Sequence, residues 1–202
     1  FSRANHRDLG GKDLADILSG IDHLVARGLV DPDRVAIQGV SYGGYLAALA
    51  AGLHSERFKA AIASAPVTNW YSYVGANFDP VHQTLGYWDL WWYEYPGLVL
   101  DRSPVAHVHR NWTPLHIDHG TLDEDVPFPQ SKELYQALRF VGAKTRLVAY
   151  PREGHDYVEE AHRIDVIQRY LDWLDAHLRS GSTQPGRGPQ EGRSIPEVDH
   201  RN

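Results

Sequence analysis

Residues 39–44, GVSYGG, constrain this chain most, because they place the pattern G-x-S-x-G between a strand-like and a helix-like segment. Residues 34–38 include β-branched side chains, whereas residues 45–51 are mainly strong helix formers. In that context the pattern predicts a nucleophile elbow, a sharp strained turn that exposes the hydroxyl of Ser41. Gly39 and Gly43 are expected to keep side chains away where strand and helix crowd together. The alternative is a chance glycine-rich turn.

Composition limits the classes of function. Of 202 residues, 42% are hydrophobic and 23% are charged, which suits one globular domain, and the net charge is −6. An acidic chain without a long apolar run predicts neither nucleic-acid binding nor a membrane span. The absence of cysteine excludes a thiol nucleophile and a Cys-ligated metal but does not fix the compartment. We expect a cytoplasmic rather than a secreted location. There is no methionine, so Phe1 is not a natural start and the chain is expected to be part of a longer polypeptide.

Hydrophobic periodicity and turn residues divide the chain into alternating helices and strands. We expect helices over 12–27, 45–53, 131–141 and 158–178, and strands over 34–38, 58–63, 115–119 and 146–150. This alternation predicts an α/β fold, with a largely parallel sheet covered by helices on both faces. Residues 1–179 form one domain in this interpretation. Residues 180–202, rich in Gly, Pro, Ser and charge, are predicted to be disordered.

Three segments have more detailed patterns. Residues 115–119, LHIDH, alternate apolar and polar side chains and so predict a half-exposed strand. In the last helix, one apolar stripe consists of Ile164, Ile167, Leu171 and Leu174. Residues 67–112 lack periodicity but contain five of the six tryptophans. This aromatic segment is interpreted either as a lid or pocket wall, or as packing that forms a small core or faces a missing domain.

The elbow serine requires two catalytic partners. A serine hydroxyl needs a base to remove its proton and a carboxylate to orient that base. The α/β-hydrolase fold supplies these in the chain order serine, acid, histidine, each after the end of a strand. Ser41 follows one predicted strand, the acidic loop 123–125 (DED) follows another, and His155 follows the last. His119 precedes the acidic loop, so we predict His155 as the base. Spacing alone does not choose the acid among the three loop residues.

The reaction also needs hydrogen-bond donors for the oxyanion. The amide of Tyr42, the residue after the serine, is one predicted donor. A second donor normally comes from a loop several elements upstream, and residues 1–38 contain no evident candidate. Loss of one donor lowers turnover by about 10²–10³. The triad is therefore expected in a site that this chain alone leaves incomplete.

Three motifs, in this order, resemble the catalytic domain of the prolyl oligopeptidase family of serine peptidases. They are residues 39–45 (GVSYGGY), 119–127 (HGTLDEDVP) with 130–131 (QS), and 150–155 (YPREGH). The similarity is greatest to the acylaminoacyl-peptidase and dipeptidyl-peptidase branches and extends from about residue 9 to residue 178. It implies that Ser41 is the nucleophile and His155 the general base, and it selects Asp123 as the acid.

The resemblance also implies a pocket and missing parts. Trp70 and Tyr73 resemble residues that line the pocket for the side chain before the scissile bond, with Tyr73 as an aromatic wall. Ordinary packing is the alternative for both. Only the second half of the family's eight-stranded α/β-hydrolase sheet is present here. The first half, a β-propeller and the tyrosine that completes the oxyanion hole are expected elsewhere in the same polypeptide. One edge of the elbow strand should then be unpaired, and the isolated chain should be unstable or associated with a partner, such as another copy.

The resemblance implies a serine-type peptidase that cleaves short peptides through an acyl-enzyme, without a metal or an organic cofactor. A carboxylesterase on the same fold uses the same triad, so the motifs do not separate the two reactions. A third hypothesis is a truncated half-domain that is inactive or only binds a partner. The missing strands and the missing oxyanion donor motivate that hypothesis.

Overall fold

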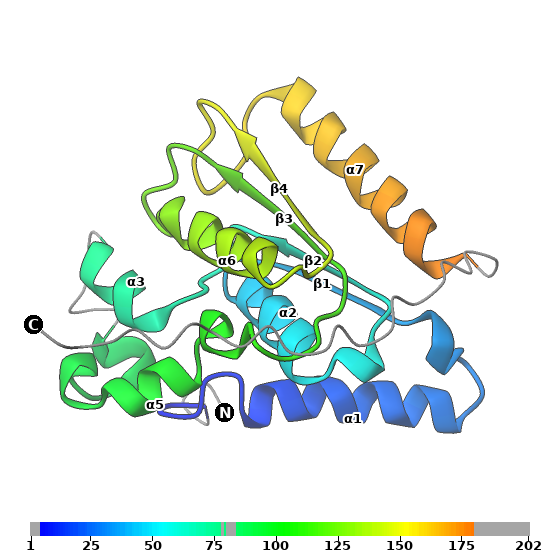
Figure 1. The fold of residues 1–202 in the computed structure, drawn as a ribbon, viewed down its shortest axis with the longest axis horizontal. Coiled ribbons are helices and arrows are strands. Elements are labelled where there is room, and N and C mark those ends of the chain that lie inside the picture. Colours follow the sequence, from blue (N-terminus) through cyan, green and yellow to red (C-terminus); the bar gives the residue numbers. More distant parts are fainter. Residues whose placement is uncertain (1–4, 78, 80–83, 180–202) are drawn as a thin grey trace, which may run out of the picture.

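A computed structural model describes residues 5–77, 79 and 84–179, and its strands form a four-stranded parallel sheet (Figure 1). The strands lie in chain order and are β1 (Ala36–Val40), β2 (Ala60–Ser64), β3 (Leu115–Gly120) and β4 (Thr145–Tyr150). The predicted parallel α/β sheet is thereby confirmed. The tail predicted over residues 180–202 lies outside the described residues.

Helices cover both faces of this sheet. The helices are α1 (Lys12–Ala26), α2 (Tyr42–Leu53), α3 (Trp70–Ala76), α5 (Pro96–Asp101), α6 (Pro129–Phe140) and α7 (Glu160–Leu178). Short 3₁₀ turns occupy Pro32–Arg34, Ser55–Arg57, Trp92–Glu94 and Pro104–His107, and a π-helical turn occupies Thr84–Trp88. Figure 1 shows α2 and α6 on one face of the sheet and α7 on the other. Within the described part of the chain, no helix combines the length and hydropathy needed to cross a bilayer.

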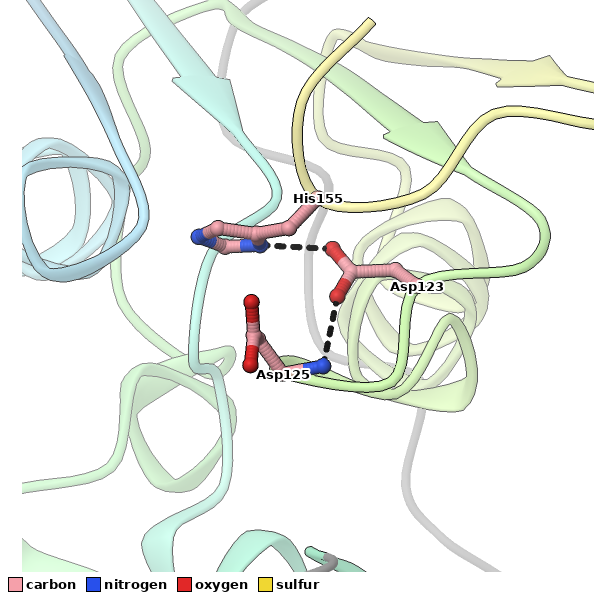
Figure 2. Close-up of side chains that lie close together, drawn as sticks. All are labelled: Asp123, Asp125 and His155. Carbon is pink, nitrogen blue, oxygen red and sulfur yellow. Dashed lines mark hydrogen bonds and ion pairs between the residues drawn. The ribbon is translucent and has the colours of Figure 1, made fainter.

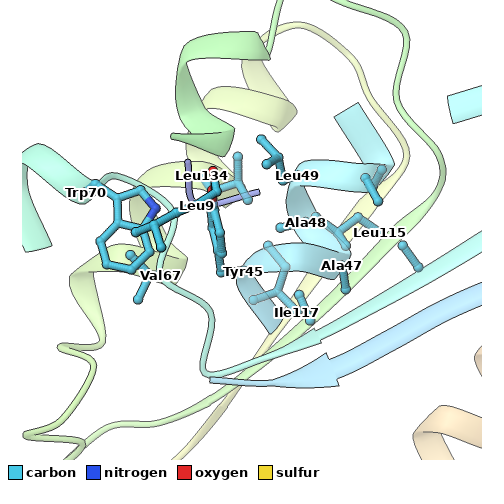
Figure 3. Close-up of a cluster of buried hydrophobic side chains, with 14 of the residues drawn as sticks. Leu9, Tyr45, Ala47, Ala48, Leu49, Val67, Trp70, Leu115, Ile117 and Leu134 are labelled. Carbon is cyan, nitrogen blue, oxygen red and sulfur yellow. The ribbon is translucent and has the colours of Figure 1, made fainter. Parts of the chain in front are cut away.

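The main core lies between the sheet and helix α2 (Figure 3). Helix α2 is almost entirely apolar because it is enclosed, and Leu49 on it is buried together with Leu115 and Ile117 of β3. Leu134 of α6 and Trp70 of α3 also belong to this cluster. The aromatic segment, residues 67–112, therefore contributes directly to the core. Burying a large apolar side chain contributes about 1.5–3 kcal/mol relative to leaving it exposed.

A smaller core forms on the opposite face, where α7 meets β2. Trp173 is 7% exposed and packs with Ile62, whereas Ile164 and Ile167 are each 61% exposed. The predicted apolar stripe is therefore wrong as a description of the packed face, although Leu174 at its end is partly buried. The packed face consists largely of aromatic residues with polar tips, which a purely hydrophobic pattern undervalues.

The prediction that β3 is half exposed is also wrong, because all six of its residues are buried. Asp118 is 0% exposed, and its carboxylate accepts three hydrogen bonds. The donors are the hydroxyls of Ser64 at 2.7 Å, Tyr157 at 2.7 Å and Tyr170 at 2.8 Å. Burial raises the pKa of Asp118, and the hydrogen bonds oppose that shift. The alternation along β3 thus separates an apolar face from a hydrogen-bonded polar face beneath α7.

His116 belongs to the same buried polar face. Its Nδ1 accepts a hydrogen bond from Arg146 Nε at 2.6 Å, and because arginine only donates, the ring proton of neutral His116 lies on Nε2. Nε2 is 3.6 Å from the carboxylate of Asp118. Burial, with a contribution from the charge of Arg146, lowers the pKa of His116 to about 3. A neutral imidazole is therefore the form that this face accommodates.

Strand β1 lies at one edge of the sheet. Among the described strands it pairs with β2 alone. Val40, at its end, is 56% exposed. This arrangement confirms the predicted unpaired edge of the elbow strand.

The two faces of α7 should respond differently to truncation. We expect Trp173→Ala to lower the free energy of unfolding by about 3–5 kcal/mol, as for other large-to-small changes in cores. Ile167→Ala, the matched control on the exposed face, should change it by less than about 0.5 kcal/mol. Urea denaturation followed by fluorescence measures both. A loss at Ile167 as large as that at Trp173 would contradict this assignment of faces.

Candidate active site

The carboxyl ends of the four parallel strands bring three loops to one edge of the sheet. Ser41 follows β1, residues 121–128 follow β3, and residues 151–159 follow β4. Backbone hydrogen bonds hold these ends together: Ser41 N donates to Ser64 O at 2.9 Å, and Ala65 N donates to Asp118 O at 2.8 Å. The edge therefore gathers the predicted serine, acid and histidine in one region of the molecule.

Ser41 occupies a strained turn between β1 and α2. Its φ of 58° and ψ of −120° lie outside the regions that a non-glycine residue normally adopts. It stands at the N-cap of α2, where serine usually bonds a backbone amide, yet its side chain makes no capping hydrogen bond. Ala65 and Arg152, which follow β2 and β4, also have positive φ, at 42° and 67°. Three of the five non-glycine residues with positive φ among the described residues thus follow strands at this edge.

Two glycines make this turn possible, and only one of them was anticipated. A Cβ atom on Gly39 would lie 2.3 Å from the backbone of Gly43, so strand and helix approach each other across Gly39. A Cβ atom on Gly44 would lie 2.5 Å from Ser64 O. A Cβ atom on Gly43 would meet nothing within 4 Å, so the prediction that Gly43 avoids a clash is wrong. Gly44, not Gly43, is the second glycine that the packing requires.

Asp123 and His155 form a hydrogen-bonded pair (Figure 2). His155 Nδ1 lies 2.8 Å from Oδ2 of Asp123, with Asp123 buried and His155 half-buried. Because an ionised carboxylate only accepts, Nδ1 carries a proton and Nε2 of the neutral ring has a free lone pair. In Figure 2 the other ring nitrogen of His155 points toward the blue ribbon of the turn between β1 and α2. The geometry is that of a base oriented by an acid.

Of the three acidic residues in this loop, Asp123 accepts the most hydrogen bonds. Its Oδ1 accepts from the backbone amides of Asp125 at 2.9 Å and Val126 at 2.8 Å. Burial by itself raises the pKa of Asp123, but hydrogen bonds from His119, His155 and Val126 outweigh it and hold the pKa well below its usual range. Asp123 is thus ionised at neutral pH. The hydrogen bond to Asp123 raises the pKa of His155, against the effect of burial.

His119 is a residue of this site that sequence reasoning missed. It is fully buried, and its Nε2 lies 2.8 Å from Val126 O and 3.1 Å from Asp123 Oδ2. A backbone carbonyl only accepts, so Nε2 carries a proton, and Nδ1 forms a hydrogen bond with the hydroxyl of Ser131 at 2.6 Å. His119 therefore donates from Nε2 to Asp123. Its position four residues before Asp123 was the available signal, but the chain order of the triad excludes His119 as the base and suggests no other role for it.

A separate set of contacts fixes the loop that carries His155. The buried carboxylate of Glu153 accepts from the amides of Val158 at 2.8 Å and Glu159 at 3.0 Å, and from His162 Nδ1 at 2.7 Å. A Cβ atom on Gly120 would lie 2.2 Å from Gly154 O, so the loops after β3 and β4 touch. The histidine is therefore placed by its whole loop and not by Asp123 alone.

The backbone after Ser41 is anchored through the side chain of Tyr42. As the first residue of α2, Tyr42 has an amide without an intrahelical acceptor. Its hydroxyl donates to the Asp13 carboxylate and accepts from Asn5 Nδ2 at 3.2 Å, and its ring stacks on Tyr87. Burial, followed by the bond to Asp13, raises the pKa of the Tyr42 phenol. None of these contacts supplies the second oxyanion donor, which we expect from elsewhere in the same polypeptide.

Trp70 and Tyr73 both lie on helix α3. Trp70 is 1% exposed and makes an edge contact with Tyr45 at 5.1 Å between ring centroids. Tyr73 is also buried and makes an edge contact with Trp70 at 5.5 Å. Their packing role is therefore directly visible. Their predicted contact with substrate stays a prediction.

Two groups of side chains have ligand types and spacing that suit a divalent cation. They are Asp123, Asp125 and His155, and Glu153, Glu159 and His162, with ligand atoms within 4.8 Å of one another in each group. In both groups the histidine Nδ1 is already hydrogen-bonded to a buried carboxylate. A metal ion would have to compete with those bonds. The expectation that no metal is needed stays a prediction.

Comparison with known proteins places this fold and these motifs in context. The model of the prolyl oligopeptidase family matches residues 1–181. The chain is 32% identical over 188 residues to YuxL, an uncharacterized peptidase of Bacillus subtilis, covering 88% of this chain and 28% of that protein. It is 30% identical to the acylamino-acid-releasing enzyme of Rattus norvegicus, covering 86% of this chain and 24% of that enzyme. The chain therefore spans about a quarter of the length of these relatives.

Solved structures agree in fold. A Mycobacterium tuberculosis puromycin-hydrolyzing peptidase superposes with a TM-score of 0.80 at 26% identity, covering 85% of this chain and 26% of that chain. Pyrococcus horikoshii acylaminoacyl peptidase superposes with a TM-score of 0.80 at 22% identity, covering 94% of this chain and 30% of that chain. The α/β-hydrolase fold is thereby confirmed, with part of the domain present in this chain.

The acid–base pair predicts a measurable titration. Asp123→Asn removes the charge that stabilises the imidazolium, so it should lower the pKa of His155. Glu124→Gln, the matched control in the same loop, should lower it much less. NMR titration of the histidine ring protons measures both shifts. An unchanged His155 pKa in Asp123→Asn would show that the hydrogen bond does not form in solution.

Proposed function

Because this chain belongs to the prolyl oligopeptidase family, we propose that it is the C-terminal part of a catalytic domain that cleaves short peptides through a covalent acyl-enzyme. The observation that supports this most directly is the 2.8 Å bond between Asp123 and His155, at the edge of the sheet where Ser41 lies in a strained turn. A serine, an imidazole and a carboxylate that follow three strands in this way suit acyl transfer, the chemistry that peptidases and carboxylesterases share.

In the proposed acylation step, Ser41 Oγ bonds to the scissile carbonyl carbon while His155 Nε2 takes the hydroxyl proton. Asp123 stabilises the resulting imidazolium, and the amide of Tyr42 donates to the oxyanion. The imidazolium then gives its proton to the leaving nitrogen as the carbon–nitrogen bond breaks. The acyl group remains on Ser41, and the amine product departs.

Deacylation reverses these roles with water as the nucleophile. His155 Nε2 removes a proton from water as its oxygen bonds to the acyl carbon. The bond to Ser41 Oγ then breaks, and the imidazolium returns its proton to that oxygen. The buried donors to Asp123 support both steps, because they keep the carboxylate ionised and oriented without a change in structure during the reaction.

The rest of the polypeptide is part of this proposal. The matched segments cover only 28% and 24% of these two relatives, and β1 has a free edge among the described strands. We place the missing strands along β1, and with them the second oxyanion donor and a propeller that limits access to short peptides. The reaction proposed here needs no metal and no organic cofactor.

Covalent labelling tests the nucleophile. A fluorophosphonate should label the wild-type protein at Ser41, and Ser41→Ala should abolish labelling because it removes the proposed nucleophile. Ser19→Ala, an exposed serine on α1, is the matched control and should be labelled like the wild type. Mass spectrometry of the labelled peptide identifies the site. Labelling that persists in Ser41→Ala would refute the assignment.

Substrate comparison tests the reaction. We expect hydrolysis of an acyl-amino-acid anilide with kcat/KM within about tenfold of that for the corresponding aryl ester, since a peptidase must expel an amine through protonation by His155. Chromogenic assays on the longest available polypeptide measure both. Turnover confined to the ester would indicate a carboxylesterase, and absence of turnover of either substrate would indicate an inactive half-domain.

A further inference from the structure

A second acidic residue, Asp125, lies beside the general base and has no role in the mechanism above. One of its carboxylate oxygens lies within 4.8 Å of a ring nitrogen of His155 and of an oxygen of Asp123. Figure 2 shows this carboxylate pointing toward the His155 ring, whereas Asp123 approaches the ring from its Nδ1 edge. The position is therefore next to the reacting atoms of the proposed triad.

The backbone holds Asp125 in this position on both sides. Its amide donates to Asp123 Oδ1 at 2.9 Å, and its carbonyl accepts from Asn77 Nδ2 at 2.6 Å. Asn77 directly follows α3, the helix that carries Tyr73. Burial, followed by the charges of Tyr87 and Asp125, raises the pKa of the Tyr73 phenol. The backbone of Asp125 is thus bonded both to the acid of the pair and to the residue that ends the helix carrying the predicted pocket wall.

The Asp125 carboxylate differs from the other carboxylates of this edge in its partners. Asp123 and Glu153 are buried and each accept two backbone amides and at least one imidazole. Asp125 is exposed, and none of the hydrogen bonds or ion pairs formed by the described residues involves its side-chain oxygens. Its charge is consequently available to a ligand.

The negative charges of Asp123, Asp125 and Asp156 each raise the pKa of His155. Resting on the proposed function, we infer that Asp125 determines specificity by pairing with an ammonium or guanidinium group on the acyl side of the scissile bond. A cationic substrate gains an ion pair there, whereas a neutral substrate leaves the carboxylate solvated. The cation is either a basic side chain or a free amino terminus, which share the same charge and hydrogen-bond donors.

Two pairs of chromogenic substrates separate these sources. Nα-acetyl-lysine and Nα-acetyl-norleucine p-nitroanilides differ only in the side-chain ammonium. Alanyl-phenylalanine p-nitroanilide with a free or an acetylated amino terminus differs only in the terminal charge. For one pair at least, Asp125→Asn should lower the charged-to-neutral ratio of kcat/KM by about fivefold, as expected for one partly exposed ion pair. Asp125→Lys should lower that ratio further, and added salt should lower it in the wild type.

Glu124→Gln is the matched control, because it removes the same charge from the neighbouring exposed position and should leave both ratios unchanged. Unchanged ratios in Asp125→Asn, or an equal fall in Glu124→Gln, would overturn the inference. The inference would also be wrong if Asp125→Asn shifted the pH profiles of charged and neutral substrates equally and left their ratio of kcat/KM unchanged. Fluorophosphonate labelling of wild-type Ser41 separates failure of this inference from failure of the proposed function. If Ser41 is labelled but the ratios do not change, only the inference about Asp125 is wrong. If Ser41 is not labelled, the proposed function is wrong.

Discussion

The arrangement at the sheet edge depends on satisfying one buried charge, the carboxylate of Asp123. Two backbone amides bind one of its oxygens, and the imidazoles of His119 and His155 bind the other. A buried carboxylate without such partners would be protonated, because desolvation disfavours the charged form. These donors come from β3, from the loop after it and from the loop after β4, so satisfying the charge ties the two loops together. The orientation of His155 follows from this requirement.

A second buried carboxylate, that of Asp118 on β3, is also satisfied by hydrogen bonds. Asp118 is buried beneath α7 and is satisfied by hydroxyls of Ser64, Tyr157 and Tyr170. Tyr157 lies two residues after His155, so the hydrogen bonds that stabilise the back of the sheet also hold the loop that presents the base. Removing one partner from such a network leaves a buried polar group unpaired, which costs about 1–3 kcal/mol. Stability of the sheet and placement of the base are thus coupled through a short stretch of chain.

The elbow couples packing to strain. Gly39 and Gly44 allow helix α2 to lie against the ends of β1 and β2, with distances that no Cβ atom would tolerate. Ser41 then has to take a positive φ, which costs of order 1–3 kcal/mol and persists only when surrounding contacts require it. Those contacts are the packing of α2 against β1 and β2 and the anchoring of Tyr42 to Asp13. The core therefore holds the serine in a conformation that the turn alone would not adopt.

Sequence by itself determined the eight main elements, their parallel α/β arrangement and the order of the three motifs, because strand and helix periodicity and the G-x-S-x-G turn are local properties. It also indicated the free edge of β1 through the resemblance. Tertiary structure decided which side of α7 is packed, that His116 and Asp118 are buried, that Gly44 matters where Gly43 does not, and that His119 donates to Asp123. Each of these depends on donors or atoms brought from distant segments, such as Arg146, Tyr170 and Ser131. An alternating pattern records which residues are apolar, but only the assembled sheet supplies the partners that make a polar residue stable inside.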